Sequence, residues 1–170
     1  MSDRSHTPAS RPVALFLSGI DGLAMVAGFL APLVLRVALA LPFFRSGLTR
    51  WDGFLQLSPS TSFLFSDVFS LHILGGEYPI PAPDLVAFMT GMAEITLPIL
   101  LILGFATRLS ALGLLAMTAV IQLVVPEGWA NFHLYWAAIA LAILALGPGS
   151  LSLDRLLVSF RSHLASKAAD

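Results

Sequence analysis

Apolar residues gather in four long stretches of the chain, separated by short polar or proline- and glycine-rich interruptions. A helix crosses the hydrocarbon core of a bilayer with about 20 apolar residues, and it satisfies its own backbone groups where no water is present. The pattern therefore predicts four transmembrane helices, over residues 30–48, 85–105, 109–125 and 129–146.

The apolar segment 13–29 precedes the first of these stretches and is less regular. It contains Ser18, Asp21 and several glycines, and a charged residue makes a separate crossing costly. We expect a short helix that lies in the membrane interface and leads into the first span. A cleaved signal peptide and a fifth crossing are the alternatives.

Composition supports an integral membrane protein. Apolar residues make up 57% of the 170 residues and charged residues 11%, whereas soluble domains carry about 25% charged residues. A soluble fold of this size could not bury so much apolar surface.

The net charge of −1, with no basic run, argues against a nucleic-acid partner. The absence of cysteine excludes disulfides, zinc thiolate sites and iron–sulfur clusters, and four scattered histidines argue against a metal site.

Lysine and arginine are distributed unevenly over the connections. Both termini and the turn 106–108 carry them, whereas the connection after the third span has Glu127 and no base. The positive-inside rule places both termini in the cytoplasm. That arrangement requires an even number of crossings and favours four spans over five. The residues that decide it are Arg4, Arg11, Arg108, Arg155, Arg161 and Lys167.

The connection 51–83, between the first two spans, then lies on the outer side of the membrane. It is strongly apolar, but Pro59 and several serines interrupt it, and it ends in the proline-rich turn 79–83. We expect this long loop to lie on, or dip into, the outer interface. It either covers a site between the outer helix ends or acts as an amphipathic connector.

Three ionisable groups are predicted inside the bilayer: Glu94 of the second span, and Arg36 and Arg45 of the first. A buried carboxylate needs a proton or a cation. The two arginines are nine residues apart, so they point to roughly opposite faces of a helix. Because Arg45 precedes the small residues Ser46 and Gly47, which allow close helix approach, we expect Arg45 to pair with Glu94 near mid-depth. Arg36 should then reach an interface. Such a pair either fixes helix register or builds a site.

Polar residues of the third and fourth spans extend this set. Together, Arg45, Glu94, Gln122 and His133 would occupy all four spans in the middle and outer half of the bundle. Inward polar groups there mark either a site or a structural network. A site of this kind suits a lipid-soluble molecule with carbonyl groups, such as a quinone, and needs no covalent cofactor. Trp136 would line it, although this tryptophan also fits an interfacial aromatic belt.

Several short motifs occur along the chain in a fixed order. They are Leu35-Arg36, the Phe-Phe-Arg-Ser-Gly run 43–47, the Glu-Tyr-Pro-Ile-Pro run 77–81, Glu94, the run 103–109 and the run 147–154. In this order and spacing, residues 30–157 resemble the DoxX family of membrane proteins. Members of that family often have a lysine after the Ser-Gly pair, near the point where this chain has Arg50.

The resemblance implies an all-α, four-helix bundle over residues 30–157 in the bacterial inner membrane, flanked by 1–29 and 158–170. It also implies a link to quinone-coupled oxidation, oxidative stress or metal response. We therefore expect a quinone-interacting accessory subunit of an oxidoreductase, with a membrane or periplasmic partner protein or a second copy of the chain. A non-catalytic anchor and a small transporter are the alternatives. Redox catalysis by this chain alone is not expected, because it has neither a thiol nor a cofactor motif.

Overall fold

The computed structural model describes residues 11–167, with side chains over 18–162 and at Lys167. The expected cytoplasmic tail residues 1–10, including Arg4, and residues 168–170 lie outside the described part. Contacts divide the chain into two units, residues 1–31 and residues 32–170. Each unit is described by itself below.

Helix α1 runs without a break from Arg11–Leu48 and belongs to both units. In the first unit, the expected interfacial segment is helical, and its side chains from Ser18 onward are exposed up to Leu30. No boundary separates it from the first span, because the candidate span Ser18–Leu48 begins well before residue 30.

The second unit holds the remaining candidate spans. Helix α3 covers Pro83–Leu103 and α4 covers Thr107–Val124. A 3₁₀ turn η2 (Pro126–Gly128) and a π-helical turn η3 (Trp129–His133) lead into α5, Leu134–Leu146. The final helix, α6, covers Leu153–Lys167. The described part therefore contains four helical segments long and apolar enough to cross a membrane, and the predicted four-helix class is confirmed.

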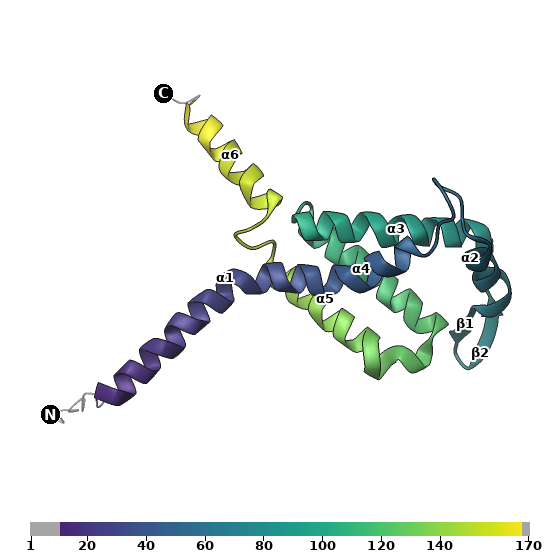
Figure 1. Cartoon of the computed structure of the whole chain (residues 1–170), viewed down its shortest axis with the longest axis horizontal. Coiled ribbons are helices and arrows are strands. Elements are labelled where there is room, and N and C mark those ends of the chain that lie inside the picture. The colour runs from purple at the N-terminus through teal and green to yellow at the C-terminus, as the bar shows by residue number, and fades with distance from the viewer. Residues whose placement is uncertain (1–10, 168–170) are drawn as a thin grey trace. The chain divides into compact units, whose positions relative to one another are not determined.

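Two apolar clusters hold the second unit together. In the larger one, Leu39, Ala40 and Phe43 of α1 pack against residues of α3, α4 and α5 (Leu101, Ala111, Leu114, Ala140 and Ile143). Figure 1 shows the part of α1 after Pro32 lying alongside these three helices. Apolar stripes that face one another in this way remove surface from the surroundings and fix the helices around a common interior.

The long loop between α1 and α3 contains more regular structure than expected. After an isolated bridge between Trp51 and Leu57, it forms α2 (Pro59–Phe63), the π turn η1 (Leu64–Val68) and a hairpin of β1 (Ser70–Ile73) and β2 (Gly76–Pro79). The hairpin turn, Leu74-Gly75, has positive φ at both positions, which matches the twist of two antiparallel strands.

This loop packs onto the bundle through the second apolar cluster. Phe65 of η1 and Ile80 are buried together with Ala87 of α3. His72 of β1 is half-buried, and its Nδ1 is hydrogen-bonded to the Leu123 carbonyl oxygen at 3.1 Å, so this side chain connects the hairpin to the end of α4. The loop therefore covers the end of the bundle formed by the start of α3 and the end of α4 (Figure 1).

Candidate functional site

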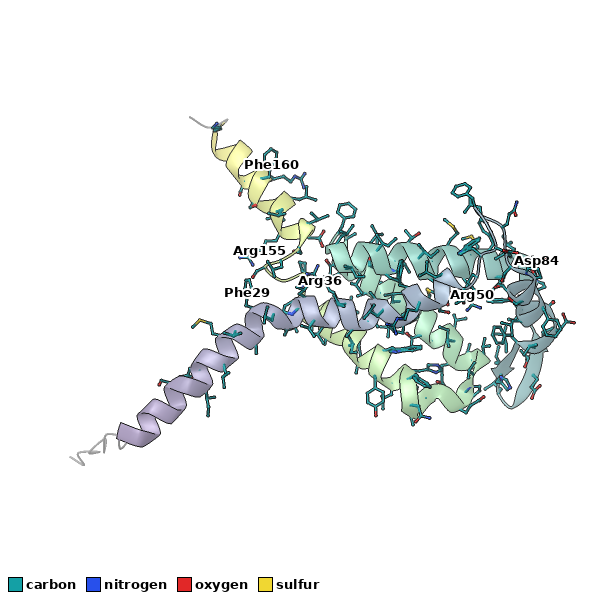
Figure 2. The ribbon with its side chains drawn as sticks, in the orientation of Figure 1. Phe29, Arg36, Arg50, Asp84, Arg155 and Phe160 are labelled. Carbon is teal, nitrogen blue, oxygen red and sulfur yellow. The ribbon has the colours of Figure 1, made fainter. Side chains whose placement is uncertain are left out.

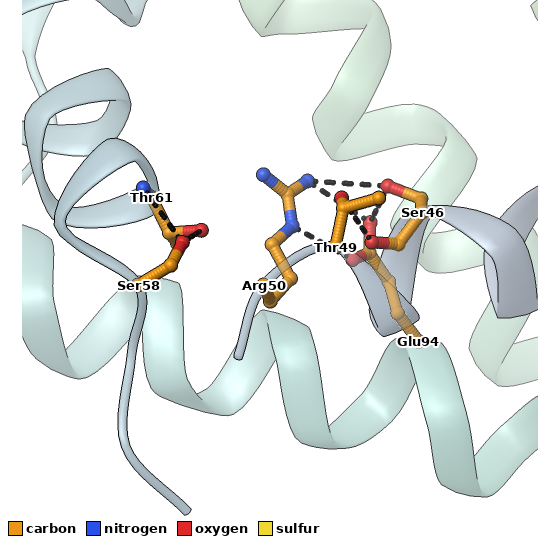
Figure 3. Close-up of polar contacts among 6 residues, drawn as sticks. All are labelled: Ser46, Thr49, Arg50, Ser58, Thr61 and Glu94. Atoms are coloured by element: carbon orange, nitrogen blue, oxygen red, sulfur yellow. Dashed lines mark hydrogen bonds and ion pairs between the residues drawn. The ribbon is translucent and has the colours of Figure 1, made fainter. Parts of the chain in front are cut away.

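The buried carboxylate of Glu94 lies in the middle of α3 and is 2% exposed. Arg50, in the turn after α1, donates from Nε to Glu94 Oε2 at 2.9 Å and from Nη2 to Oε1 at 3.2 Å. Ser46 Oγ donates to Oε1 at 3.1 Å. Figure 3 shows Arg50 reaching across to Glu94 beside Ser46. The carboxylate is thus neutralised by a two-pronged, charge-assisted contact of the kind that guanidinium groups form best.

The expectation that Arg45 neutralises Glu94 is wrong, since the partner is Arg50. Arg45 is exposed. Ser46 and Arg50 lie four residues apart and share a face near the end of α1, whereas Arg45 points about 100° away from Ser46. Glu94 lies in the middle of α3, but it contacts the last turn of α1, at Ser46 and Gly47, and not the middle of α1.

Two glycines allow the backbone approach that brings this pair together. A Cβ at Gly47 would lie 2.9 Å from the backbone carbon of Glu94, and a Cβ at Gly91 would lie 2.8 Å from the ring of Trp51. Any larger side chain at either position would push the end of α1 away from α3. The close approach indicated by the Ser46-Gly47 pair is therefore present, and it serves Arg50.

The ion pair forms part of the wall of a cavity of about 350 Å³ between the long loop and the helices. Four polar residues line it: Ser46, Arg50, Thr90 and Glu94. The other walls are apolar and come from α1, the long loop, α3, α4 and α5; they include Phe43, Phe65, Phe69, Ile80, Val86, Val120, Val124 and Trp136. A mostly apolar cavity with a few convergent polar groups is the usual form of a small-molecule site.

Two polar groups on this wall have donor capacity left over. The guanidinium of Arg50 lies 5.2 Å from the centre of the Phe65 ring, and its Nη1 donates to none of the residues whose side chains the structure describes. Thr90 lies one turn before Glu94 on α3, and within the same described residues its hydroxyl has no hydrogen-bond partner. A ligand with an acceptor oxygen can therefore bind here without displacing the ion pair.

Gln122 and His133 form a separate pair. His133 is 3% exposed, and its Nδ1 lies 2.6 Å from Gln122 Oε1, while Gln122 Nε2 donates to the Pro126 carbonyl oxygen at 2.9 Å. Because that amide oxygen can only accept, Nδ1 carries the proton. Gly128 leaves room for the imidazole, since a Cβ there would lie 2.5 Å from the ring. Neither Gln122 nor His133 lines the 350 Å³ cavity.

Trp136 links this pair to the cavity. Its ring centre lies 5.4 Å from that of His133 and 5.0 Å from that of Phe43, and the side chain lines the cavity. The predicted site residues are therefore divided: Glu94 and Trp136 lie on one cavity, Gln122 and His133 bond to each other, and Arg45 is exposed. Arg50 and Thr90 were missed. The signal for Arg50 was its position four residues after Ser46, near the family's lysine.

Arg36 occupies a different buried position, at the other end of the bundle part of α1 (Figure 2). It is fully buried and donates to the carbonyl oxygens of Pro32 at 3.2 Å, Ile102 at 3.3 Å and Leu151. The expectation that it joins the Glu94 pair is wrong, and its guanidinium is enclosed among backbone carbonyls near the ends of the spans. Gly104, with φ of +70°, leaves room for it, since a Cβ there would meet Arg36 Nη1.

Asp154 completes this second cluster. Its carboxylate accepts from the backbone N–H groups of Ala106 at 2.8 Å and Thr107 at 2.9 Å, and so caps the start of α4. Burial acts to raise the pKa of Asp154, but the hydrogen bonds from Thr107 and Ala106 and the charge of Arg36 outweigh burial and lower the pKa. Arg36, Gly104, Asp154 and the Leu151 carbonyl are called the Arg36 tie below.

Comparison with known proteins identifies the family. The family model described as DoxX matches residues 31–127. The chain belongs to the DoxX family. The match includes Arg36, Arg50, Thr90 and Glu94, whereas His133 and Asp154 lie beyond it.

The DoxX chain also has a curated relative without an assigned role. It is 30% identical over 143 residues to an uncharacterized protein of Haemophilus influenzae, covering 74% of this chain and 82% of that protein. No solved structure gives a significant match. Among the described residues, no cluster of three or more histidine or carboxylate side chains is arranged to hold a metal ion.

Proposed function

We propose that this DoxX protein binds a quinone in the 350 Å³ cavity and serves as an accessory subunit of a quinone-linked oxidoreductase. The observation that carries the proposal is the Arg50–Glu94 pair on a mostly apolar wall, with one guanidinium nitrogen of Arg50 that donates to no residue of the described part of the chain. A bound quinone would supply the exchange of electrons with the partner enzyme. The residues of this chain would hold and orient the ring.

The chemistry of the cavity suits a neutral ring with carbonyl groups. Because Glu94 balances the charge of Arg50, this wall of the cavity carries no net charge. A neutral ligand therefore leaves no buried charge without a counter-charge. Arg50 Nη1 and the Thr90 hydroxyl can donate to a carbonyl oxygen. Phe43, Phe65 and Trp136 offer flat apolar surface to the ring. The volume lies within the range of about 300–1,000 Å³ found for ligand pockets.

The membrane placement is also part of the proposal. Arg108, Arg155, Arg161 and Lys167 lie at the ends of the spans or beyond the last one, and the positive-inside rule assigns that side to the cytoplasm of the inner membrane. The long loop and the cavity then lie in the outer half. Quinone would reach the cavity from the hydrocarbon core.

A second candidate function is a non-catalytic anchor for another membrane protein or a second copy of this chain. A groove of about 450 Å³ between α4 and α5 favours it, because the small side chains of Ala116, Ala119 and Ala137 form part of its lining. Small residues allow another helix to approach closely. Under this alternative, the ion pair is only an internal tie and the cavity binds no quinone.

Thermal unfolding of the purified protein with short-chain ubiquinone and menaquinone analogues tests the proposal. A ligand that binds only the folded state raises Tm, with a stabilisation of about 2.7 kcal/mol at a concentration 100 times Kd. We expect a rise with at least one quinone and a much smaller one with an alkylbenzene of equal size that lacks carbonyl groups. Equal rises with both compounds, or no rise with any quinone, would contradict the proposal.

Matched variants locate the binding. Val124→Phe fills the cavity, whereas Val34→Phe makes the same change at a side chain on α1 that is 60% exposed and outside the cavity lining. Thr90→Val removes one hydroxyl and keeps the volume. We expect Val124→Phe to abolish the quinone-dependent rise, Thr90→Val to reduce it, and Val34→Phe to leave it unchanged. A rise that persists in Val124→Phe would place binding elsewhere.

A further inference from the structure

Helix α6 has an apolar face that no other part of the described chain covers. Leu153, Leu156, Leu157 and Phe160 are spaced to form one stripe along the helix. Their side chains are 39%, 62%, 49% and 62% exposed, respectively. Most of this stripe is therefore open, which is unusual for large apolar side chains in water.

The charges of α6 lie mainly outside this stripe, and three of the four are positive. Arg155 and Ser159 lie on the side of the helix opposite Leu157, and Arg161 flanks the stripe. Arg155, Arg161 and Lys167 are exposed. Asp154 is the one acidic residue of the helix, and its carboxylate is engaged in capping α4. The accessible charge of α6 is consequently basic.

The start of α6 is held at the level where the spans end. Only residues 147–152 separate it from the last residue of α5, Leu146. The backbone N–H of Asp154 donates to the Gly104 carbonyl at 2.9 Å, and Arg36 donates to the Leu151 carbonyl. Gly104 lies between the ends of two candidate spans. The first turn of α6 therefore lies at the edge of the membrane. At this position the apolar stripe either faces water or enters the membrane interface.

We propose that α6 lies in the membrane interface and binds anionic lipid. The stripe Leu153–Leu156–Leu157–Phe160 enters the boundary between headgroups and acyl chains. Arg161 and Lys167 contact lipid phosphates, and Arg155 adds to the positive charge that attracts anionic lipid. An apolar face with basic residues beside it is the usual composition of such helices, and anionic lipid attracts bases that lie next to a span. This surface is independent of the quinone proposal, because it shares no residue with the cavity.

Site-directed spin labelling of the full chain in vesicles tests the proposal. The sequence contains no cysteine, so single cysteines can be labelled without removing native ones. Leu157→Cys reports on the apolar stripe and Ser159→Cys on the opposite side. Leu41→Cys, on an exposed α1 side chain within a span and outside both cavity linings, gives the lipid reference. The measurement is the collision rate of each label with oxygen, which partitions into lipid, and with a water-soluble nickel chelate.

In vesicles that contain phosphatidylglycerol, we expect the label at position 157 to resemble the lipid reference and the label at 159 to collide mainly with nickel. If both labels collide mainly with nickel, α6 lies in water and the proposal is overturned. If the label at 157 is protected from both reagents, the stripe is covered by protein, which also overturns it.

A charge-neutralised chain separates the role of anionic lipid from that of the apolar stripe. The triple variant Arg155→Gln, Arg161→Gln, Lys167→Gln should lower the oxygen-to-nickel ratio at 157 in phosphatidylglycerol vesicles. The same variant should change the ratio little in vesicles of phosphatidylcholine alone. An unchanged ratio in both vesicle types would overturn the assignment of anionic lipid as the partner.

Discussion

Two arginines contact the interior of the bundle and have different roles: Arg36 lies within α1, and Arg50 lies in the turn that follows it. Arg36 is fully buried, donates to three backbone carbonyls and lies near a carboxylate that is itself engaged by two backbone N–H groups. The side chain of Arg50 is 13% exposed and pairs with one carboxylate, that of Glu94. It also lines the cavity, and its Nη1 donates to no residue of the described part of the chain.

This difference shows how burial alone fails to identify a site. A buried guanidinium whose three nitrogens all donate to the protein, like that of Arg36, fixes the positions of helices, since removing it leaves other polar groups unpaired. A buried charge that retains a donor next to empty apolar space can also serve a ligand. By this criterion, the Arg36 tie is structural and the Arg50–Glu94 pair is the functional candidate.

The largest expected effect comes from Arg36→Met. It leaves the carbonyls of Ile102 and Leu151 without their donor and removes the positive charge near Asp154, so we expect a loss of about 3–5 kcal/mol in unfolding free energy. Reversible denaturation in mild detergent measures it. The matched control is Arg45→Met, at an exposed arginine of the same helix, which should change stability by less than about 0.5 kcal/mol. Comparable losses in the two variants would contradict the difference in burial.

The next effect separates stability from binding at Arg50 and Glu94. Arg50→Met and Glu94→Leu each leave a buried charge unpaired and should each cost about 3 kcal/mol. The double variant should recover much of that loss, with a coupling of about 1–3 kcal/mol, yet it should bind no quinone. If the double variant still binds quinone as the wild type does, the ion pair plays no part in recognition.

A smaller effect is expected at the Gln122–His133 pair. Gln122→Leu leaves the buried Nδ1–H of His133 without its acceptor, which costs about 1–3 kcal/mol. Quinone-dependent stabilisation should persist, because neither residue lines the cavity. Loss of quinone binding without loss of stability would contradict this expectation and would indicate that Gln122 and His133 belong to the ligand site, as the sequence predicted.

The smallest effect is the pH dependence of the Arg36 tie. The pKa of Asp154 is lowered in the folded protein, so its contribution is fully present above the unfolded pKa of about 3.9. That contribution is lost as the pH falls through the folded pKa. The Asp154→Asn variant should lose less stability than the wild type over this acid range. Parallel acid titrations of unfolding free energy would show the difference, and identical curves would contradict it.

The spans were predictable because lipid imposes a simple requirement on length and polarity. The pairing of Glu94 was not, because it depends on where α1 ends opposite α3, and the residues concerned are 44 positions apart in sequence. The Arg36 tie depends likewise on a contact across 115 positions with Leu151. The hairpin was missed because its two strands are four residues each and its turn begins with Leu74, an unusual residue at positive φ.

The candidate site was anticipated in kind and partly in its residues. A buried carboxylate neutralised by an arginine was foreseen, and so was the part played by Ser46 and Gly47, but the arginine lies in the turn after the first span and not within the span. The long loop was considered as a cover, and Phe65, Phe69 and Ile80 do line the cavity. The separation of His133 from the cavity follows from the π-helical turn η3 and from Gly128, which helical periodicity does not predict.

Mass spectrometry of the protein extracted with its native lipids tests the central claim most directly. The molecule retained by the wild type is identified and compared with that retained by Val124→Phe and Val34→Phe. Our account predicts a quinone bound to the wild type and to Val34→Phe, and its loss from Val124→Phe. A wild-type protein that carries no quinone, or a quinone retained equally by Val124→Phe, would contradict it.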